Sequence, residues 1–173
     1  MVTIKELQQE LEQEAQATRR VLERVPGDRL EWRPHPKSMS LGQLAMHVAT
    51  LPGALAELAM QDGFDVGTEI PRPGAASTAE LLERHERSIA AAKAALAGMD
   101  PPTLDALWTM KQGDQVLWTI PRRAFLRSVL FNHWYHHRGQ LTVYLRQTGA
   151  MVPATYGDSA DEKPAPPKAK SGS

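Results

Sequence analysis

Four stretches of the chain have apolar residues spaced three and four positions apart, a pattern that places a hydrophobic stripe along one side of an α-helix. The stretches cover about residues 3–25, 41–61, 78–97 and 121–148, and a glycine or proline follows each within two residues. A stripe of this kind has to be buried against another element. The pattern therefore predicts an all-α fold in which four helices form a bundle.

Capping residues mark two of the helix starts. Ser40 directly precedes the second stretch, where its side chain can accept from a free backbone amide. Ser77 and Glu80 have the spacing of a capping box at the start of the third. Pro121 suits the first position of the last helix, where no amide hydrogen is needed. Residues 62–76 contain three glycines and two prolines and predict a loop.

A small β-hairpin is expected before the last helix. Residues 107–110 and 116–119 are rich in β-branched and aromatic side chains and flank the sequence Lys-Gln-Gly-Asp-Gln. An isolated hairpin of this size is only marginally stable, so we expect it to pack on the helices.

The chain of 173 residues is suited to one domain with one hydrophobic core. We expect this domain to cover residues 1–158. Residues 159–173 contain no large apolar side chain and predict a disordered C-terminal tail.

Charge and composition exclude several functions. Lys plus Arg and Asp plus Glu both total 20, so the sequence offers no electrostatic attraction for nucleic acid or an anionic membrane. No stretch approaches the roughly 18 apolar residues of a membrane span, and the first residues lack the pattern of a signal peptide. We therefore expect a cytoplasmic protein. The chain has no cysteine, so a bound metal would need histidine or carboxylate ligands.

Three histidines lie on stripes that are expected to face the core. His133 and His137 are four residues apart in the last predicted helix, so both side chains lie on one face and can reach a single ion. His47 lies between Leu44 and Leu51 in the stripe of the second helix. Three imidazoles suit zinc, nickel, iron or copper better than magnesium or calcium. The pattern favours a divalent transition metal site.

Spacing alone leaves alternatives open. A histidine in an apolar stripe is often hydrogen-bonded to a carbonyl and binds no metal. His133 and His136, three residues apart, would also share a helix face. His35 and His85 lie among prolines and charged residues and are expected at the surface.

Two segments carry a resemblance to a known family. The sequences RPHPKSMSLGQLAMHVATLPG at 33–53 and NHWYHHRGQLTVYLRQTG at 132–149 resemble the signature stretches of the DinB/YfiT-like family. The resemblance extends over about residues 1–158 and implies that family's helical fold and its metal triad. Matched residue by residue, the triad is His47, His133 and His137, which leaves His136 outside it.

The resemblance and the open metal position that three ligands leave imply several activities. Some relatives resemble thiol-dependent S-transferases, in which zinc, nickel or iron would activate a low-molecular-weight thiol. A metal-dependent hydrolase is an alternative, although no carboxylate adjoins either histidine motif to act as a base. A non-enzymatic stress-response or binding protein, stabilised by its metal, is another. Family members are often homodimers.

Four further residues are candidates for lining the pocket around the metal. Trp32 and Tyr156 lie in the flanking loops, where an aromatic side chain more often covers the core. Gln140 and Arg138 follow the histidines in the last helix and would orient ligands or bind substrate, although polar residues of a helix usually face solvent.

Overall fold

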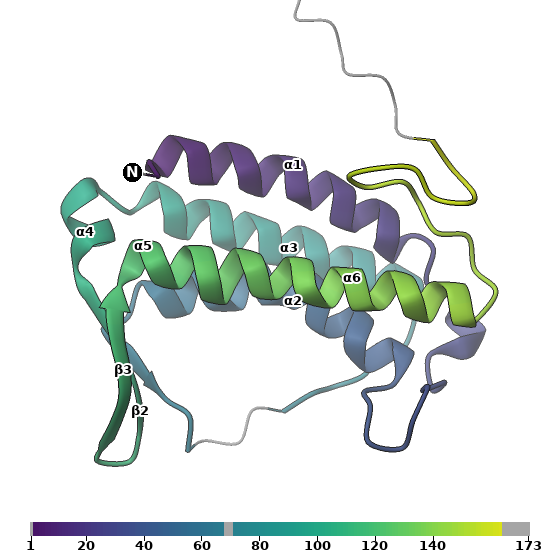
Figure 1. The fold of residues 1–173 in the computed structure, drawn as a ribbon, viewed down its shortest axis with the longest axis horizontal. Helices are drawn as coiled ribbons and strands as arrows, with labels where there is room; N and C mark the ends of the chain where they lie inside the picture. Colours follow the sequence, from purple (N-terminus) through teal and green to yellow (C-terminus); the bar gives the residue numbers. More distant parts are fainter. Residues whose placement is uncertain (1, 68–70, 164–173) are drawn as a thin grey trace, which may run out of the picture.

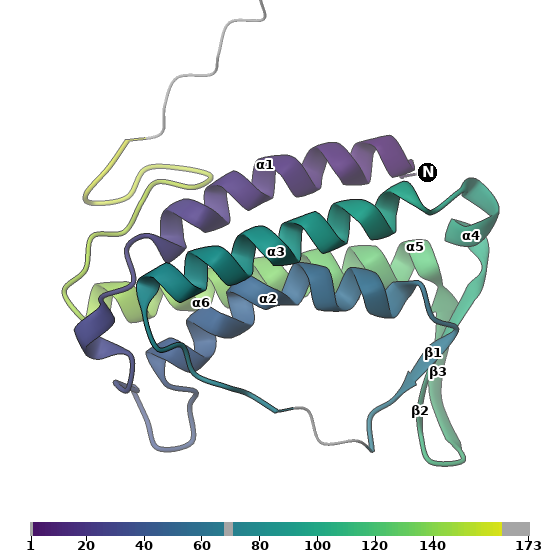
Figure 2. The same ribbon diagram turned by 180° about the vertical axis from the view of Figure 1, so that it is seen from behind.

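The computed structural model describes residues 2–67 and 71–163. Within these residues four long helices lie side by side, with a small sheet at one end (Figures 1 and 2). The long helices are α1 (Ile4–Leu22), α2 (Leu41–Ala59), α3 (Thr78–Ala97) and α6 (Asn132–Gln147). The fold is thus predominantly helical, as the apolar periodicity predicts. None of the described helices combines the length and the apolar character needed to cross a bilayer.

The helix starts depend on side-chain caps. Ser40 and Gln43 form a reciprocal capping box at α2, and Thr3 and Glu6 form another at α1. The box predicted for α3 is only half formed: Ser77 accepts from the amide of Glu80. The Glu80 carboxylate instead accepts from the amide of Ala76, at 2.8 Å.

The sheet has one strand more than the sequence predicts. Strands β2 (Leu107–Gln112) and β3 (Gln115–Pro121) are antiparallel and form the expected hairpin. Strand β1 (Gly63–Asp65), in the segment predicted to be a loop, pairs in parallel with β2. Its first residue lies so close to β2 that a Cβ there would come within 2.2 Å of the Thr109 carbonyl oxygen, so only glycine fits. The all-α prediction is corrected by this three-stranded sheet.

The last part of the helical region is divided into three segments. A short helix α5 (Arg122–Phe125) leads into a π-helical segment (Leu126–Phe131), which leads into α6. Before the hairpin, η1 (Gly27–Arg29) and α4 (Pro101–Asp105) are single short turns. The helix predicted over 121–148 is thus helical without a break from Arg122 to Gln147, but residues Leu126–Phe131 have π rather than α turns. A helical pattern of apolar residues does not distinguish the two kinds of turn.

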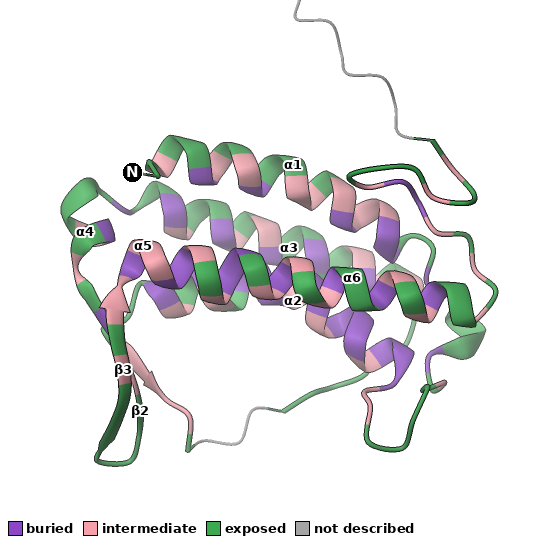
Figure 3. Cartoon of the chain, viewed as in Figure 1, coloured by how far each residue is buried: buried purple, intermediate pink, exposed green. Residues whose placement is uncertain are grey.

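The core lies between the long helices, whose facing sides are buried in Figure 3. Its largest fully buried side chains are aromatic and come mainly from the region around the hairpin and the last helices: Trp108, Phe125, Phe131 and Trp134. Trp108 donates its indole hydrogen to the Leu58 carbonyl at 3.1 Å, which attaches the sheet to the end of α2. The hairpin therefore packs on the helices, as expected.

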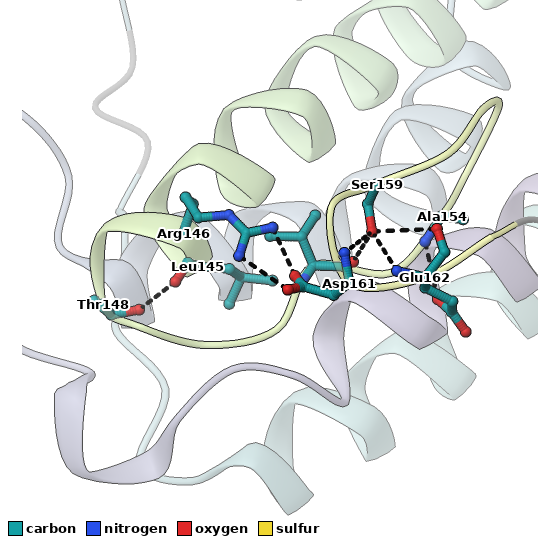
Figure 4. A network of polar contacts seen from close by, with 8 residues as sticks. Leu145, Arg146, Thr148, Ala154, Ser159, Asp161 and Glu162 are labelled. Atoms are coloured by element: carbon teal, nitrogen blue, oxygen red, sulfur yellow. Dashed lines mark hydrogen bonds and ion pairs between the residues drawn. The ribbon is translucent and has the colours of Figure 1, made fainter.

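The C-terminal segment folds back over the ends of α1 and α6 (Figure 4). Asp161 accepts from Arg146 at 2.6 Å and from the Val152 amide at 2.8 Å. Glu162 accepts from Arg20 at 2.6 Å and from the Ala154 amide at 2.9 Å. Asp161 and Glu162, which fall in the predicted tail, thus contact both α1 and α6. The rest of that predicted tail, 164–173, lies outside the described residues.

Helices α2 and α3 are in close contact at Gly53. The Gly53 amide donates to Ser88 Oγ at 2.8 Å, and this hydroxyl donates to the Thr50 carbonyl at 3.0 Å. A Cβ at Gly53 would lie 2.7 Å from the Ser88 carbonyl oxygen. The obstructing atom belongs to the backbone, so it cannot rotate away, and the absence of a side chain sets the helix spacing.

We expect Gly53→Ala to destabilise the protein by about 1–3 kcal/mol, because α2 and α3 must separate to accept the methyl group. Gly139→Ala is the matched control, since a Cβ at that position of α6 meets nothing within 4 Å. The control should gain about 0.5–1 kcal/mol from the better helix propensity of alanine. Urea unfolding followed by far-ultraviolet circular dichroism measures both. Equal effects of the two substitutions would contradict the close approach.

Candidate metal centre

Three histidines from two helices converge on one point. One ring nitrogen from each of His47, His133 and His137 lies within 4.8 Å of the others. The Nε2 atoms of His133 and His137 are 2.7 Å apart. The ring of His47 lies 4.6 Å from that of His137 and 5.4 Å from that of His133, measured between centroids. No carboxylate of a described residue joins the group.

Helix geometry explains the placement of each ring. His133 and His137 are one turn apart on α6, so their side chains stack on the face turned toward α2. His47 points from α2 between the buried Leu44 and Leu51. All three histidines are half-buried rather than enclosed. The cluster therefore lies at the edge of the core, where a small molecule can reach it.

A buried hydrogen bond joins α2 and α6 at the level of the histidines. Pro52 has no amide hydrogen, so the carbonyl of Val48 loses its normal partner within α2. Trp134, fully buried on α6, donates its indole hydrogen to that carbonyl at 3.0 Å. Val48 follows His47 and Trp134 follows His133, so the bond joins the neighbours of two of the three histidines.

The π-helical segment ends directly before α6, two residues ahead of His133. The wider turns of a π segment are uncommon and occur frequently at functional sites. In this chain the feature lies in the element that supplies two of the three imidazoles. It agrees with a functional role for this end of α6.

The environment keeps all three imidazoles neutral. Burial, together with smaller contributions from the charges of His137 and His133, lowers the pKa of His47 to about 4. Burial likewise lowers the pKa of His133 and of His137 below the ordinary value of 6.5. Neutral imidazoles keep a lone pair for coordination, and a metal would displace no proton from them at neutral pH.

Hydrogen bonds fix which nitrogens face the centre. His137 Nδ1 lies 2.7 Å from the amide oxygen of Gln140, which can only accept, so Nδ1 carries the hydrogen and Nε2 keeps its lone pair. The Nε2 of His133 faces this lone pair at 2.7 Å. In the absence of metal this contact is a hydrogen bond in which His133 Nε2 donates to the lone pair of His137 Nε2. An acceptor behind each ligating ring is typical of histidine metal sites.

The donor set fits a divalent transition metal. Zinc holds imidazole nitrogens at about 2.0–2.1 Å, which places two of them about 3.3 Å apart in a tetrahedron. The separations in this cluster, from 2.7 Å up to at most 4.8 Å, bracket that value. Small rotations of the rings would bring all three into range. Three nitrogen ligands leave at least one coordination position open.

The structure separates the candidate pocket residues into two groups. Gln140 contacts the triad directly through His137. The ring of Trp32 packs edge-on against Tyr144 at 5.5 Å, two turns beyond His137 on α6. In contrast, Arg138 and Tyr156 bind each other and Glu14 on the side of α6 that faces α1.

The remaining histidines lie outside the triad. His136 is exposed, and its ring centroid lies 5.0 Å from that of His137. His35 is exposed, as expected. His85 was expected at the surface, but it is only 2% exposed and its Nε2 lies 3.1 Å from the Ala15 carbonyl oxygen. Its charged sequence neighbours face solvent, whereas its own side of α3 packs against α1.

One charged residue near the triad was missed in the sequence. Arg72 is exposed in the segment after β1, and its positive charge lowers the pKa of each of the three histidines. Arg72 lies in a glycine- and proline-rich loop, and a loop sequence has no periodicity that would indicate which way its side chains point. Only the contacts of that segment with α2 reveal its position.

A surface cavity elsewhere in the protein is distinct from the candidate metal centre. A surface cavity of about 410 Å³ lies beside β1 and is lined by residues that include Asp62, Phe64 and Lys111. No histidine borders it. The chemistry of the three imidazoles, rather than cavity size, identifies the centre.

The described fold is helical, with a three-histidine cluster between α2 and α6 that is compatible with metal binding. Comparisons with known proteins place the chain in a family. The sequence profile of the DinB family matches residues 1–168, and the chain belongs to this family. It is similar to the uncharacterized protein YrdA of Bacillus subtilis (strain 168), at 26% identity over 154 residues, which cover 86% of this chain and 85% of YrdA.

Two solved structures share the fold. A DinB-like protein from Bacillus cereus ATCC 10987 superposes with a TM-score of 0.71 at 25% identity, over 89% of this chain and 98% of the other. The DinB-like protein YjoA from Bacillus subtilis superposes with a TM-score of 0.64 at 21% identity, over 84% and 93% of the two chains. The predicted family is therefore confirmed.

The lowered pKa of His47 predicts a pH-dependent stability of the metal-free protein. Between about 4 and the ordinary value of 6.5, the unfolded chain binds a proton at His47 that the folded chain does not. Stability should therefore fall as the pH is lowered through this window. Urea unfolding at a series of pH values, with chelator present, measures the slope.

His47→Gln should flatten that slope, whereas His35→Gln, at an exposed position, should leave it unchanged. An identical slope in wild type and His47→Gln would show that His47 titrates normally.

Proposed function

We propose that the protein is a metal-dependent enzyme that binds one divalent transition metal, zinc or nickel, through His47, His133 and His137 and activates a low-molecular-weight thiol for S-transfer. The convergence of three neutral imidazoles carries this proposal. An ion held by neutral ligands keeps its full charge and lowers the pKa of a thiol or water in its open position.

The transfer itself needs little from the protein beyond positioning. The thiol gives its proton to solvent, and its sulfur forms a bond to an electrophilic carbon of the second substrate. The bond from that carbon to the leaving group breaks, and the leaving group departs with the electron pair. Gln140 keeps the lone pair of His137 directed at the centre, and the Trp134 bond keeps α6 in register.

The placement of carboxylates favours thiol transfer over hydrolysis. Activation of water for attack usually requires a general base near the metal. The two α1 glutamates that contact α6 are engaged elsewhere: Glu10 binds Arg127 and Tyr135, and Glu14 binds Arg138. A thiolate needs no base at the moment of attack.

Metal analysis of protein purified without chelator provides the first test. We expect about one zinc or nickel ion per chain in wild type, and loss of that ion in His133→Ala, because two nitrogens hold an exchangeable metal poorly. His136→Ala is the matched control and should keep the metal. A wild-type protein that neither contains nor takes up metal ends the proposal.

A thiol-transfer assay provides the second test. Wild type should accelerate the substitution of the halide of an electron-poor aryl halide by cysteine or mercaptoethanol, with release of halide ion. It should lose this activity with chelator and regain it with added zinc. Turnover that chelator leaves unchanged would contradict the proposal. A metal-loaded protein with a large chelator-dependent fall in Tm and no turnover on any electrophile would instead assign the metal a structural role.

A further inference from the structure

The segment that contains Arg72 is attached to the first turn of α2. The amide nitrogen of the Gln43 side chain donates to the Arg72 carbonyl at 3.2 Å. The Ala75 amide donates to the Gly42 carbonyl at 3.4 Å, and the Ala75 side chain is buried. Residues 72–75 thus lie across the start of the helix that carries His47.

Gln43 directs this segment toward the histidines. It lies one turn before His47, so the two side chains share a face of α2. Its side-chain oxygen accepts from the Ser40 amide at 2.9 Å while its nitrogen holds Arg72, so both ends of the side chain are fixed. The backbone of Arg72 is therefore anchored one helical turn from a metal ligand.

The side chain of Arg72 is close enough for its charge to act on all three histidines. In the part of the chain that the structure describes, Arg72 has no ion-pair partner. Ten other arginine and lysine residues do form such pairs, as with Arg138 and Glu14. The anchored backbone of Arg72 thus keeps an exposed guanidinium near a site that itself gains positive charge when metal binds.

We propose that Arg72 binds a carboxylate group of the small molecule whose donor atom occupies the open metal position. This inference rests on the proposed function and names the class of its thiol substrate, a carboxylate-bearing thiol. The planar fork of a guanidinium matches the two oxygens of a carboxylate, and such charge-assisted pairs are stronger than neutral hydrogen bonds. The thiolate at the metal and the carboxylate at Arg72 together would offset two of the three positive charges.

Cobalt-substituted protein and two small thiols of similar size test the proposal. Mercaptoacetate carries a carboxylate where mercaptoethanol carries a hydroxyl. The charge-transfer absorption of a cobalt-bound thiolate reports the Kd of each thiol, without any need for turnover. Arg72→Gln should weaken mercaptoacetate binding about tenfold, or about 1.4 kcal/mol, and should change mercaptoethanol binding by less than about twofold. Arg72→Lys should fall between wild type and Arg72→Gln, because it keeps the charge without the fork.

Arg84→Gln is the matched control, since Arg84 is exposed on α3 and is not among the charges that act on the three histidines. It should bind both thiols as wild type does. Direct chelation of cobalt by the carboxylate would persist in Arg72→Gln, so unchanged mercaptoacetate binding in that variant overturns the inference. Equal weakening of both thiols overturns it as well, because Arg72 would then act only on the thiolate charge.

The same experiment distinguishes failure of the two proposals. If wild type takes up no cobalt, the proposed metal site is wrong, and so is the proposed role of Arg72. If wild type binds cobalt and thiols but Arg72→Gln has no selective effect, only the carboxylate assignment is wrong.

Discussion

The hydrogen bond from Trp134 to the carbonyl of Val48 determines how α6 lies along α2. Pro52 leaves that carbonyl without its helical partner, and Trp134 is fully buried, so each group satisfies the other. A slide of α6 by one turn would leave both unpaired, at a cost of about 1–3 kcal/mol for each buried group. Such a slide would also move His133 away from His47. The convergence of the imidazoles therefore depends on Pro52, which leaves the Val48 carbonyl without a partner in α2, and on Trp134, whose indole donates to that carbonyl.

The opposite side of α6 is fixed by charge. Arg138, next to His137, is only 3% exposed and pairs with Glu14 at 2.6 Å, while Tyr156 donates to the same carboxylate at 2.6 Å. Removing one partner of a buried pair typically costs about 3–5 kcal/mol, because the other charge stays behind. This network resists rotation of α6 about its axis, as the Trp134 bond resists sliding. Arg138 and Tyr156 thus have a structural role on the α1 side, while Gln140 contacts the triad.

Periodicity and capping chemistry predict the parts of this fold that local sequence controls. The four long helices follow from apolar spacing, and the proximity of His133 to His137 follows from one helical turn. The approach of His47 to this pair is a tertiary contact, which the core-facing stripes of the two helices favoured and the family resemblance specified. Strand β1 escaped prediction because three residues are too few for a pattern, and its pairing with β2 is long-range. The proximity of Arg72 to the histidines was not predicted, because a loop sequence has no periodicity that would indicate where its side chains point.

Charge balance connects the metal centre with its ligand. The three imidazoles contribute no negative charge, and among the described residues no carboxylate joins them. The α1 glutamates that could have approached α6 are already neutralised: Glu10 by Arg127 and Glu14 by Arg138. An ion in the centre, with Arg72 beside it, would therefore form a concentrated positive charge without compensation from these side chains. Such a site stabilises anions, which for a thiol means the reactive thiolate. The lack of a nearby carboxylate, which weakens the case for hydrolysis, thus strengthens the case for an anionic nucleophile supplied by the ligand itself.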